Sequence, residues 1–357
     1  MTFKGLFLRA LILTGLGAVV FPAGVWGSGH KTGGDAGVLV VMTHDSFNIS
    51  RKVMDAFEAR NHVKVKFLKA GDAGAALNQA ILSKNNPMAD VFFGVDNTFL
   101  SRALDAGLFE PHHSPALEKI PETFRLDKQN RLLPIDFGDV CLNYDIRWLA
   151  GRNIPPPAQM ADLIKPEYKG LVVVQNPATS SPGLAFLLAT ISRFGESGYL
   201  DFWKKLKKNK VLATNGWNDA YWGHFTAASK GSRPIVVSYA TSPAAEVHFS
   251  PGKKGPPPTA ALTGPGDCFR QIEFAGILKG ARNPKKAGAL IDFMLAKTFQ
   301  ENIPLSMFVF PTHPGAALPE VFEKYARMAE QPGFIPYERI AEKRMEWIEA
   351  WTREMLR

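Results

Sequence analysis

Short apolar runs alternate with helix-like stretches along most of the chain. Residues 38–42, 91–93, 171–174 and 235–237 are uninterrupted apolar runs, which is typical of strands buried on both faces of a sheet. Residues 63–67 instead alternate apolar residues with lysine, as expected of a half-exposed strand. Apolar residues at helical spacing follow these runs. The alternation predicts an α/β protein.

One apolar run is longer and stands near the middle of the chain. Residues 132–144 separate two regions of alternating strand and helix patterns, and a second extended run at residues 268–278 indicates a return. We interpret the two runs as paired hinge strands between two lobes, with Asp136, Phe137 and Asp139 facing the cleft. Clefts between domains commonly hold small ligands. The alternative is a buried strand inside one large domain.

The length of 357 residues favours two domains over one. The hinge interpretation predicts a discontinuous first lobe. It comprises residues 28–137 and 272–357, including the C-terminal helices, and the second lobe comprises residues 138–271.

The N-terminal segment, residues 1–27, has the composition of a secretory signal peptide. Lys4 and Arg9 precede an apolar segment at residues 10–21, and no acidic residue occurs among residues 1–27. We expect the segment to be cleaved and the protein to be periplasmic. An uncleaved membrane anchor is the alternative, which the short apolar core with its glycines disfavours.

Three predicted strands of the first lobe each deliver an acidic residue to the loop that follows. These residues are Asp45, which His44 precedes, Asp72 and Asp96. In open α/β sheets the ligand lies beyond the carboxyl ends of the strands, where such loops meet. Each aspartate also suits the N-cap of the next helix. The three together favour a ligand contact for at least one of them.

Polar and aromatic residues follow the predicted strands of the second lobe. The loop at residues 175–183 runs into an apolar helix, and its hydroxyls and free amides suit either a polar ligand or the capping of that helix. Trp217 and Tyr221 lie at the start of a later helix, and Tyr239 ends a strand. A late apolar segment brings Phe308 toward the cleft.

Charge and motifs exclude several classes of function. The formal charge is +9, but the dense basic run at residues 204–210 has the order of a solvated helix face. Basic and aromatic residues are not interleaved as on a nucleic-acid platform, so we expect no nucleic-acid partner. The chain has no HExxH, CxxC, phosphate-binding glycine loop or GxSxG motif, so we predict no metal site and no cofactor.

The chain has two cysteines, and one falls in each proposed hinge strand. An oxidising compartment favours a disulfide between Cys141 and Cys268 if the strands are neighbours. Two buried free thiols are the alternative.

Five segments, in order along the chain, resemble the thiamine-binding periplasmic proteins of ABC importers. They are residues 43–47 (THDSF), 89–97, 179–184 (TSSPGL), 216–221 and 238–243 (SYATSP). A further segment, residues 279–300, is typical of the wider class of extracellular solute-binding proteins. The resemblance implies a type II periplasmic-binding-protein fold whose two lobes close on a ligand and dock on an inner-membrane ABC permease. We expect a monomer.

In the family that this chain resembles, aromatic side chains and a carboxylate hold the thiazolium and the aminopyrimidine of thiamine. Asp72, Trp217 and Tyr239 match ligand-binding positions of the family, and the loop ending at Gly183 supplies polar contacts. Aromatic residues of the family are replaced at His44, Phe137, Asp139, Ala245 and Phe308, which leaves a thinner aromatic enclosure. The ligand-binding residues that we predict are Asp72, Trp217, Tyr239, Ser180, Ser181, Gly183, Tyr221, His44, Asp45, Phe137, Asp139 and Phe308.

The leading hypothesis is a non-enzymatic receptor for thiamine, a thiamine phosphate or a related small organic cation. A quaternary thiazolium nitrogen has no proton to donate, so it depends on ring faces and nearby negative charge. A polyamine is an alternative ligand, whereas ferric iron fits poorly because adjacent tyrosines are missing. The rival class is an enzyme: thiaminase I resembles this fold and uses a hinge-region cysteine, for which Cys141 is the candidate, although an apolar strand disfavours its thiolate.

Overall fold

The computed structural model describes residues 37–250 and 255–357. The predicted signal peptide, residues 1–27, lies outside the described residues. Within the described ranges, no helix is both long enough and apolar enough to cross a membrane.

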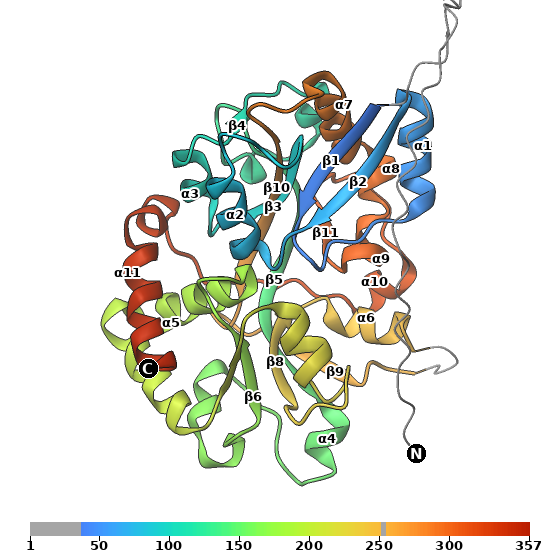
Figure 1. Cartoon of the computed structure of the whole chain (residues 1–357). Coiled ribbons are helices and arrows are strands. Elements are labelled where there is room, and N and C mark those ends of the chain that lie inside the picture. Colours follow the sequence, from blue (N-terminus) through green and yellow to red (C-terminus); the bar gives the residue numbers. More distant parts are fainter. Residues whose placement is uncertain (1–36, 251–254) are drawn as a thin grey trace, which may run out of the picture. The chain divides into compact units, whose positions relative to one another are not determined.

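The described residues form one 11-stranded sheet with the order β2-β1-β3-β10-β5-β8-β6-β7, while β4 pairs with β10, and β9 and β11 pair with β5 (Figure 1). The strands are β1 (Gly37–Thr43), β2 (Val63–Lys69), β3 (Val91–Asp96), β4 (Phe109–Glu110), β5 (Leu133–Asp145), β6 (Val172–Gln175), β7 (Leu212–Thr214), β8 (Ile235–Tyr239), β9 (Thr259–Leu262), β10 (Phe269–Leu278) and β11 (Phe310–Pro311). We call β1 to β4 the first sheet half and β6 to β9 the second sheet half.

Helices connect these strands and pack against the sheet. They are α1 (Arg51–Asn61), α2 (Ala73–Leu82), α3 (Leu100–Asp105), α4 (Ile146–Ala150), α5 (Ser181–Lys208), α6 (Ser242–His248), α7 (Pro284–Leu295), α8 (Lys297–Gln300), α9 (Ile303–Met307), α10 (Glu320–Tyr325) and α11 (Tyr337–Leu356). A short π-helical turn, η5 (Asp219–His224), follows β7, and 3-10 turns lie at residues 115–119, 122–124, 160–164 and 166–168.

The predicted apolar runs are strands of two parallel groups. β1 pairs in parallel with β2 and β3, and β6 pairs in parallel with β7 and β8. Parallel strands are covered on both faces, which explains their continuous apolar sequences. Because the strands within each group run in one direction, the loops at their carboxyl ends gather at one edge, as predicted for the loops after β1 and β2 that hold Asp45 and Asp72.

β5 and β10 join the two sheet halves. They pair antiparallel from Phe269 with Val140 to Ala275 with Leu133, which confirms the predicted pairing of the two long runs. The later part of β5, from Val140 to Tyr144, pairs with β8. β5 and β10 therefore lie between the two sheet halves and connect them (Figure 1).

A disulfide joins Cys141 of β5 to Cys268, the residue before β10. Both cysteines are fully buried, next to Ala240 and Ala329. Of the two alternatives left open by the sequence, the structure has the disulfide.

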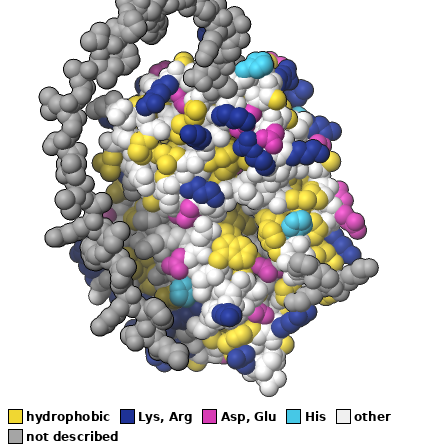
Figure 2. Space-filling view, turned by 45° about the vertical axis from the view of Figure 1, so that its right-hand side comes forward, with side chains coloured by type: hydrophobic (Ala, Val, Ile, Leu, Met, Phe, Trp, Pro, Cys, Tyr) yellow, Lys and Arg dark blue, Asp and Glu magenta, His cyan; other side chains and the backbone are white. Residues whose placement is uncertain are grey.

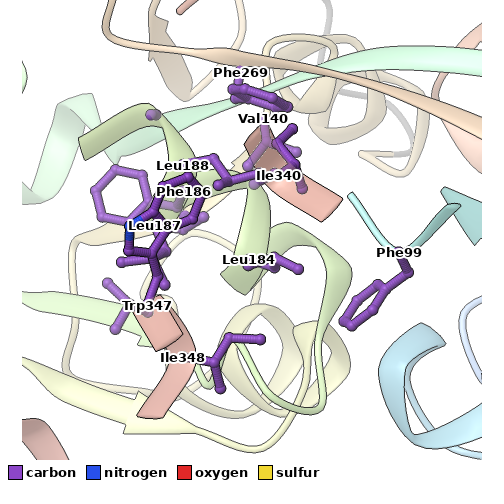
Figure 3. Close-up of a cluster of buried hydrophobic side chains, with 14 of the residues drawn as sticks. Phe99, Val140, Leu184, Phe186, Leu187, Leu188, Phe269, Ile340, Trp347 and Ile348 are labelled. Carbon is purple, nitrogen blue, oxygen red and sulfur yellow. The ribbon is translucent and has the colours of Figure 1, made fainter. Parts of the chain in front are cut away.

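The C-terminal helix, α11, packs mainly against α5. We expected the C-terminal helices in the first lobe; α11 contacts α3, which follows β3 of the first sheet half, but lies along α5, which follows β6 of the second sheet half (Figure 1). Trp347 and Ile348 of α11 point into the same apolar cluster as Phe186 of α5 (Figure 3), and the rings of Trp351 and Trp203 meet with centroids 5.5 Å apart. The apolar stripe of α11 is thus buried against α5 because α5 offers the matching large rings.

The basic run, residues 204–210, lies at the end of α5. Lys204, Lys205, Lys207 and Lys208 are exposed whereas Leu206 is buried, as predicted for a solvated helix face. On the face drawn in Figure 2, basic and acidic side chains are interspersed.

Candidate ligand-binding cavity

A cavity of about 280 Å³ lies where the carboxyl-end loops of both sheet halves meet. Its walls come from the loop after β1, the start of α2, the start of α5, the residues before and within η5, the end of β8, β10, and the end of α9. Eight of the twelve predicted site residues line it: His44, Asp45, Asp72, Ser181, Trp217, Tyr221, Tyr239 and Phe308.

Trp217 is held at the cavity by two hydrogen bonds and a stack. Its backbone N–H donates to Asp72 Oδ2 at 2.8 Å, and its indole Nε1–H donates to Ser238 Oγ at 2.9 Å. The indole stacks on Tyr221 with centroids 4.7 Å apart and planes 17° from parallel. The Tyr221 hydroxyl in turn donates to Glu246 at 2.5 Å. Since the indole N–H and the Tyr221 hydroxyl both have protein partners, the parts of the two rings that line the cavity offer it an aromatic surface.

Asp72 connects the two sheet halves. It caps α2 by accepting the Ala73 N–H at 2.6 Å, and its other oxygen accepts the Trp217 N–H. Beside it, the Ala75 N–H donates to the Thr179 carbonyl at 3.2 Å. Burial raises the pKa of Asp72, and hydrogen bonds from Trp217, Ser180 and Ala73 only partly oppose this rise. Asp72 therefore acts first as a bridge across the cavity.

Tyr239 lies at the end of β8 with its ring in the cavity wall. Its hydroxyl is 3.2 Å from Gln271 Oε1, and the Gln271 amide donates to Ser181 Oγ at 2.8 Å. Burial, with Glu273, Asp72, Asp96 and Asp136 nearby, raises the pKa of Tyr239 well above its ordinary value, so the phenol stays neutral. A chain of hydrogen bonds thus fixes Tyr239 and Ser181 relative to each other.

His44 lies in the loop after β1 and is almost fully buried. Its Nδ1 is 2.9 Å from Ser46 Oγ and its Nε2 is 3.4 Å from Glu273 Oε1. Gly94 (φ 108°) lets the ring approach β3 closely, because a Cβ there would lie 2.6 Å from His44 Cδ2. Burial lowers the pKa of His44, but Glu273, Asp72 and Asp45 outweigh it, so the pKa lies above its ordinary value.

Glu273 also lines the cavity, although it was not among the predicted site residues. It lies within β10, is 7% exposed and lines the cavity beside His44. A carboxylate inside an otherwise apolar strand, IEFAGIL, was the signal available in the sequence. It places a negative charge in the cavity wall.

An aromatic rim surrounds part of the cavity. Trp222 and Phe249 are 47% and 56% exposed, and the Phe249 ring contacts that of Phe308 at 5.1 Å. Phe308 has a left-handed backbone (φ 54°), and its carbonyl accepts the Thr241 hydroxyl. Large exposed rings of this kind beside a cavity are typical of ligand-binding surfaces.

Phe137 and Asp139 do not line the cavity. Phe137 stacks between Phe124 and Phe310, with centroids 4.7 and 5.5 Å away. Asp139 forms a two-hydrogen-bond ion pair with Arg270, both at 2.8 Å. Side chains alternate between the faces of a strand, so residues 137 and 139 share one face and Asp136, near Glu273, has the other. Our expectation that all three face the cleft was therefore wrong.

Ser180 and Gly183 lie behind the cavity wall. The Ser180 hydroxyl caps α5 by accepting the Gly183 N–H at 3.4 Å. A Cβ on residue 183 would lie 2.7 Å from the Gln175 carbonyl oxygen, so Gly183 allows α5 to approach β6. Of the predicted loop, Ser181 reaches the cavity surface.

Comparison with known proteins identifies the class of protein. Residues 86–331 match the family model described as bacterial extracellular solute-binding protein, and the chain belongs to this family. Among curated relatives, it is 32% identical over 325 residues to the thiamine-binding periplasmic protein of Escherichia coli K12, covering 90% of this chain and 94% of that protein. The thiamine-binding periplasmic protein of Brucella melitensis is 31% identical over 320 residues, covering 88% and 90%.

Solved structures agree with this assignment. A periplasmic thiamin binding protein superposes with a TM-score of 0.79 at 30% identity, covering 90% of this chain and 96% of that one. The apo ferric ion-binding protein A of Pasteurella haemolytica has a TM-score of 0.71 at 20% identity, which shows a shared fold alone. The predicted periplasmic-binding-protein fold is confirmed.

Proposed function

We propose that this protein is a periplasmic solute-binding protein that captures thiamine and delivers it to an ABC importer. The observation that carries the proposal is a cavity that combines aromatic faces with buried carboxylates. Relatives named as thiamine-binding periplasmic proteins support the choice of ligand. Trp217, Tyr221, Tyr239 and Phe308 supply the faces.

The chemistry of the cavity suits a permanent organic cation. Each well-placed aromatic face stabilises such a cation by about 0.5 to 2 kcal/mol. A thiazolium nitrogen carries no proton, so it donates no hydrogen bond and is stabilised by these faces and by nearby negative charge. The aminopyrimidine, by contrast, needs hydrogen-bonding groups, which Ser181 and Asp45 supply at the cavity surface.

Charge at the cavity favours thiamine over its phosphates. Asp45, Asp72 and Glu273 are acidic lining residues, and Lys69 is the lysine among the lining residues. Lys69 donates to the Asp45 carbonyl at 2.9 Å, which holds its ammonium group at one side of the cavity. A phosphate placed in the cavity faces more negative than positive groups. We therefore expect thiamine to bind more tightly than thiamine diphosphate.

A polyamine is the second candidate ligand, and the acidic lining is the feature that favours it. Ammonium groups need several hydrogen-bond acceptors each. The oxygens of Asp72 already accept backbone N–H groups, which leaves few acceptors for a polyamine. Aromatic faces favour the flat rings of thiamine instead.

The role that we propose is binding without catalysis. The thiaminase-like alternative requires a free thiolate at Cys141, but this sulfur is bonded to Cys268 and fully buried. A disulfide sulfur is not a nucleophile. We also propose that the ligand-contacting residues are the eight predicted ones that line the cavity, together with Glu273.

Isothermal titration calorimetry of the mature protein with thiamine, thiamine diphosphate and spermidine tests the proposal. We expect saturable one-to-one binding of thiamine, weaker binding of the diphosphate and no saturable binding of spermidine. Absence of thiamine binding would overturn the proposed function. Incubation of thiamine with the protein and an added nucleophile, followed by chromatography, should release no pyrimidine.

We further propose a monomer whose two lobes, residues 28–137 with 272–357 and residues 138–271, close on the ligand and dock on a membrane permease. The position of α11 on α5 modifies this division at the C-terminus. Light scattering after gel filtration measures the mass, and small-angle X-ray scattering with and without thiamine measures closure as a smaller radius of gyration.

A further inference from the structure

Three carboxyl groups lie side by side on neighbouring strands below the cavity. In the register of the sheet, Glu273 of β10 pairs with Asp96 of β3 on one side and with Asp136 of β5 on the other. Asp96 and Asp136 are 0% and 1% exposed. Like charges placed opposite each other destabilise a sheet, so the row requires a compensating positive charge or a proton.

The described residues compensate the negative charge of these three carboxyl groups only in part. Neither oxygen of Asp136 accepts a hydrogen bond from the described residues, and one oxygen of Asp96 is also without a partner there. Burial and the adjacent Glu273 raise the pKa of Asp136 well above its ordinary value, so Asp136 keeps its proton. His44, whose Nε2 lies 3.4 Å from Glu273 Oε1, is a cationic group in reach of the row from the cavity side.

Glu273 is the member of the row that borders the cavity. Asp72 also borders it, but its two oxygens accept the backbone N–H groups of Ala73 and Trp217. The carboxylate of Glu273 accepts no hydrogen bond from a backbone N–H group of the described residues; its partner across the cavity wall is the His44 ring. A ligand cation therefore has more to gain at Glu273 than at Asp72.

We propose that Glu273 is the carboxylate that receives the ligand's positive charge, and that His44 neutralises it in the empty cavity, so that binding a cation releases a proton. This inference rests on the proposed function and adds to it the residue that recognises charge. The proton leaves the His44 imidazolium, whose Nε2 lies 3.4 Å from Glu273 Oε1, and passes to the solvent. No covalent bond changes.

The proton release makes affinity depend on pH, with a sign that follows from the charges. The titratable groups facing Glu273 are His44 from the loop after β1, Asp96 of β3, Asp136 of β5 and Tyr239 of β8, with Asp45 and Asp72 near His44. A bound cation repels a proton on any of them. Affinity for a permanent cation therefore rises with pH, by up to about tenfold per pH unit while one proton is released.

Calorimetry with thiamine between pH 6 and 8, in buffers of different ionisation enthalpy, measures the number of protons released. The wild-type protein is expected to release up to one proton. Glu273→Gln is expected to bind thiamine at least about tenfold more weakly at pH 8, since the ligand's cation loses a buried opposite charge. His44→Gln is expected to bind at least as tightly as wild type at pH 6 and to release fewer protons. The titration of thiamine itself is common to all variants and cancels in the comparison.

Two controls separate charge recognition from structural damage. Glu349→Gln removes an exposed carboxylate from α11 and is expected to change neither affinity nor proton release. The neutral aminopyrimidine alcohol that lacks the thiazolium tests the ligand side, since Glu273→Gln should weaken its binding far less than that of thiamine. Equal losses for both ligands would mean that Glu273 acts by shaping the cavity.

The outcomes distinguish this inference from the proposed function. If the wild-type protein does not bind thiamine, the proposed function fails. If the wild-type protein binds thiamine but releases no proton, or Glu273→Gln keeps wild-type affinity, this inference fails and the function stands. Should Glu273→Gln not fold, the pH dependence of His44→Gln decides: a slope equal to that of wild type contradicts the inference.

Discussion

Removing the Cys141–Cys268 disulfide tests how the junction between β5 and β10 is stabilised. The bond spans a sequence separation of 127 residues. The loss of unfolded-chain entropy for a loop of this length corresponds to about 5 kcal/mol at 25 °C, an upper estimate because measured values more often lie at about 2 to 4 kcal/mol. The variant Cys141→Ala/Cys268→Ala is therefore expected to lose about 2 to 5 kcal/mol of unfolding free energy. It should keep its fold, since β5 and β10 remain hydrogen-bonded along their length.

Urea unfolding followed by circular dichroism measures this loss, and the slope of free energy against urea should increase because the unlinked chain unfolds further. Both sulfur atoms are fully buried, so alanine also leaves a small gap. Wild-type protein unfolded with a reductant separates the two effects, because it lacks the bond but keeps the sulfur atoms. If the double variant unfolds at the same urea concentration as oxidised wild type, the entropic argument is refuted.

Three further predictions concern the cavity and the buried acids. Trp217→Ala removes the ring that stacks on Tyr221 and is expected to weaken thiamine binding by about 1 to 3 kcal/mol, measured by calorimetry. Asp72→Asn weakens a charged hydrogen bond to the Trp217 N–H and should reduce thiamine affinity by about 1 to 2 kcal/mol, while an unchanged affinity would contradict its bridging role. Burial raises the pKa of Asp96 to about 7, so the protonated Asp96 carboxyl contributes to the stability of the folded protein at low pH, and this contribution is lost as the pH rises toward 7. In thermal unfolding, Asp96→Asn should therefore be more stable relative to wild type at pH 8 than at pH 5. Equal differences at both pH values would exclude this titration.

Local sequence patterns predicted much of the candidate site. Asp72 lies at the N-cap of α2 and Trp217 lies two residues before η5, because residues that follow buried parallel strands lie at the carboxyl edge of the sheet. The capping interpretation of Asp72 is confirmed, since one oxygen caps α2, and the other oxygen reaches across to Trp217. Local sequence could not show this second contact, which joins residues 145 positions apart.

Register decided which hinge residues border the cavity. Phe137 and Asp139 had the chemistry of ligand-binding residues, yet the pleat of β5 turns them to the face occupied by Phe310 and Arg270. Glu273 became a cavity residue because β10 pairs with β3 and β5 at the position where Asp96 and Asp136 lie. A shift of one residue in that pairing would exchange the faces.

Periodicity and composition alone determined that this chain builds an α/β sheet with two long central strands and acidic and aromatic loops at the strand ends, because these features depend on neighbours within a few residues. Only the tertiary structure decided that α11 packs on α5, that the two cysteines bond, and that His44 meets Glu273. Each of these depends on contacts between distant residues, and such contacts follow from strand register and from which apolar surfaces match in shape, which no short segment specifies.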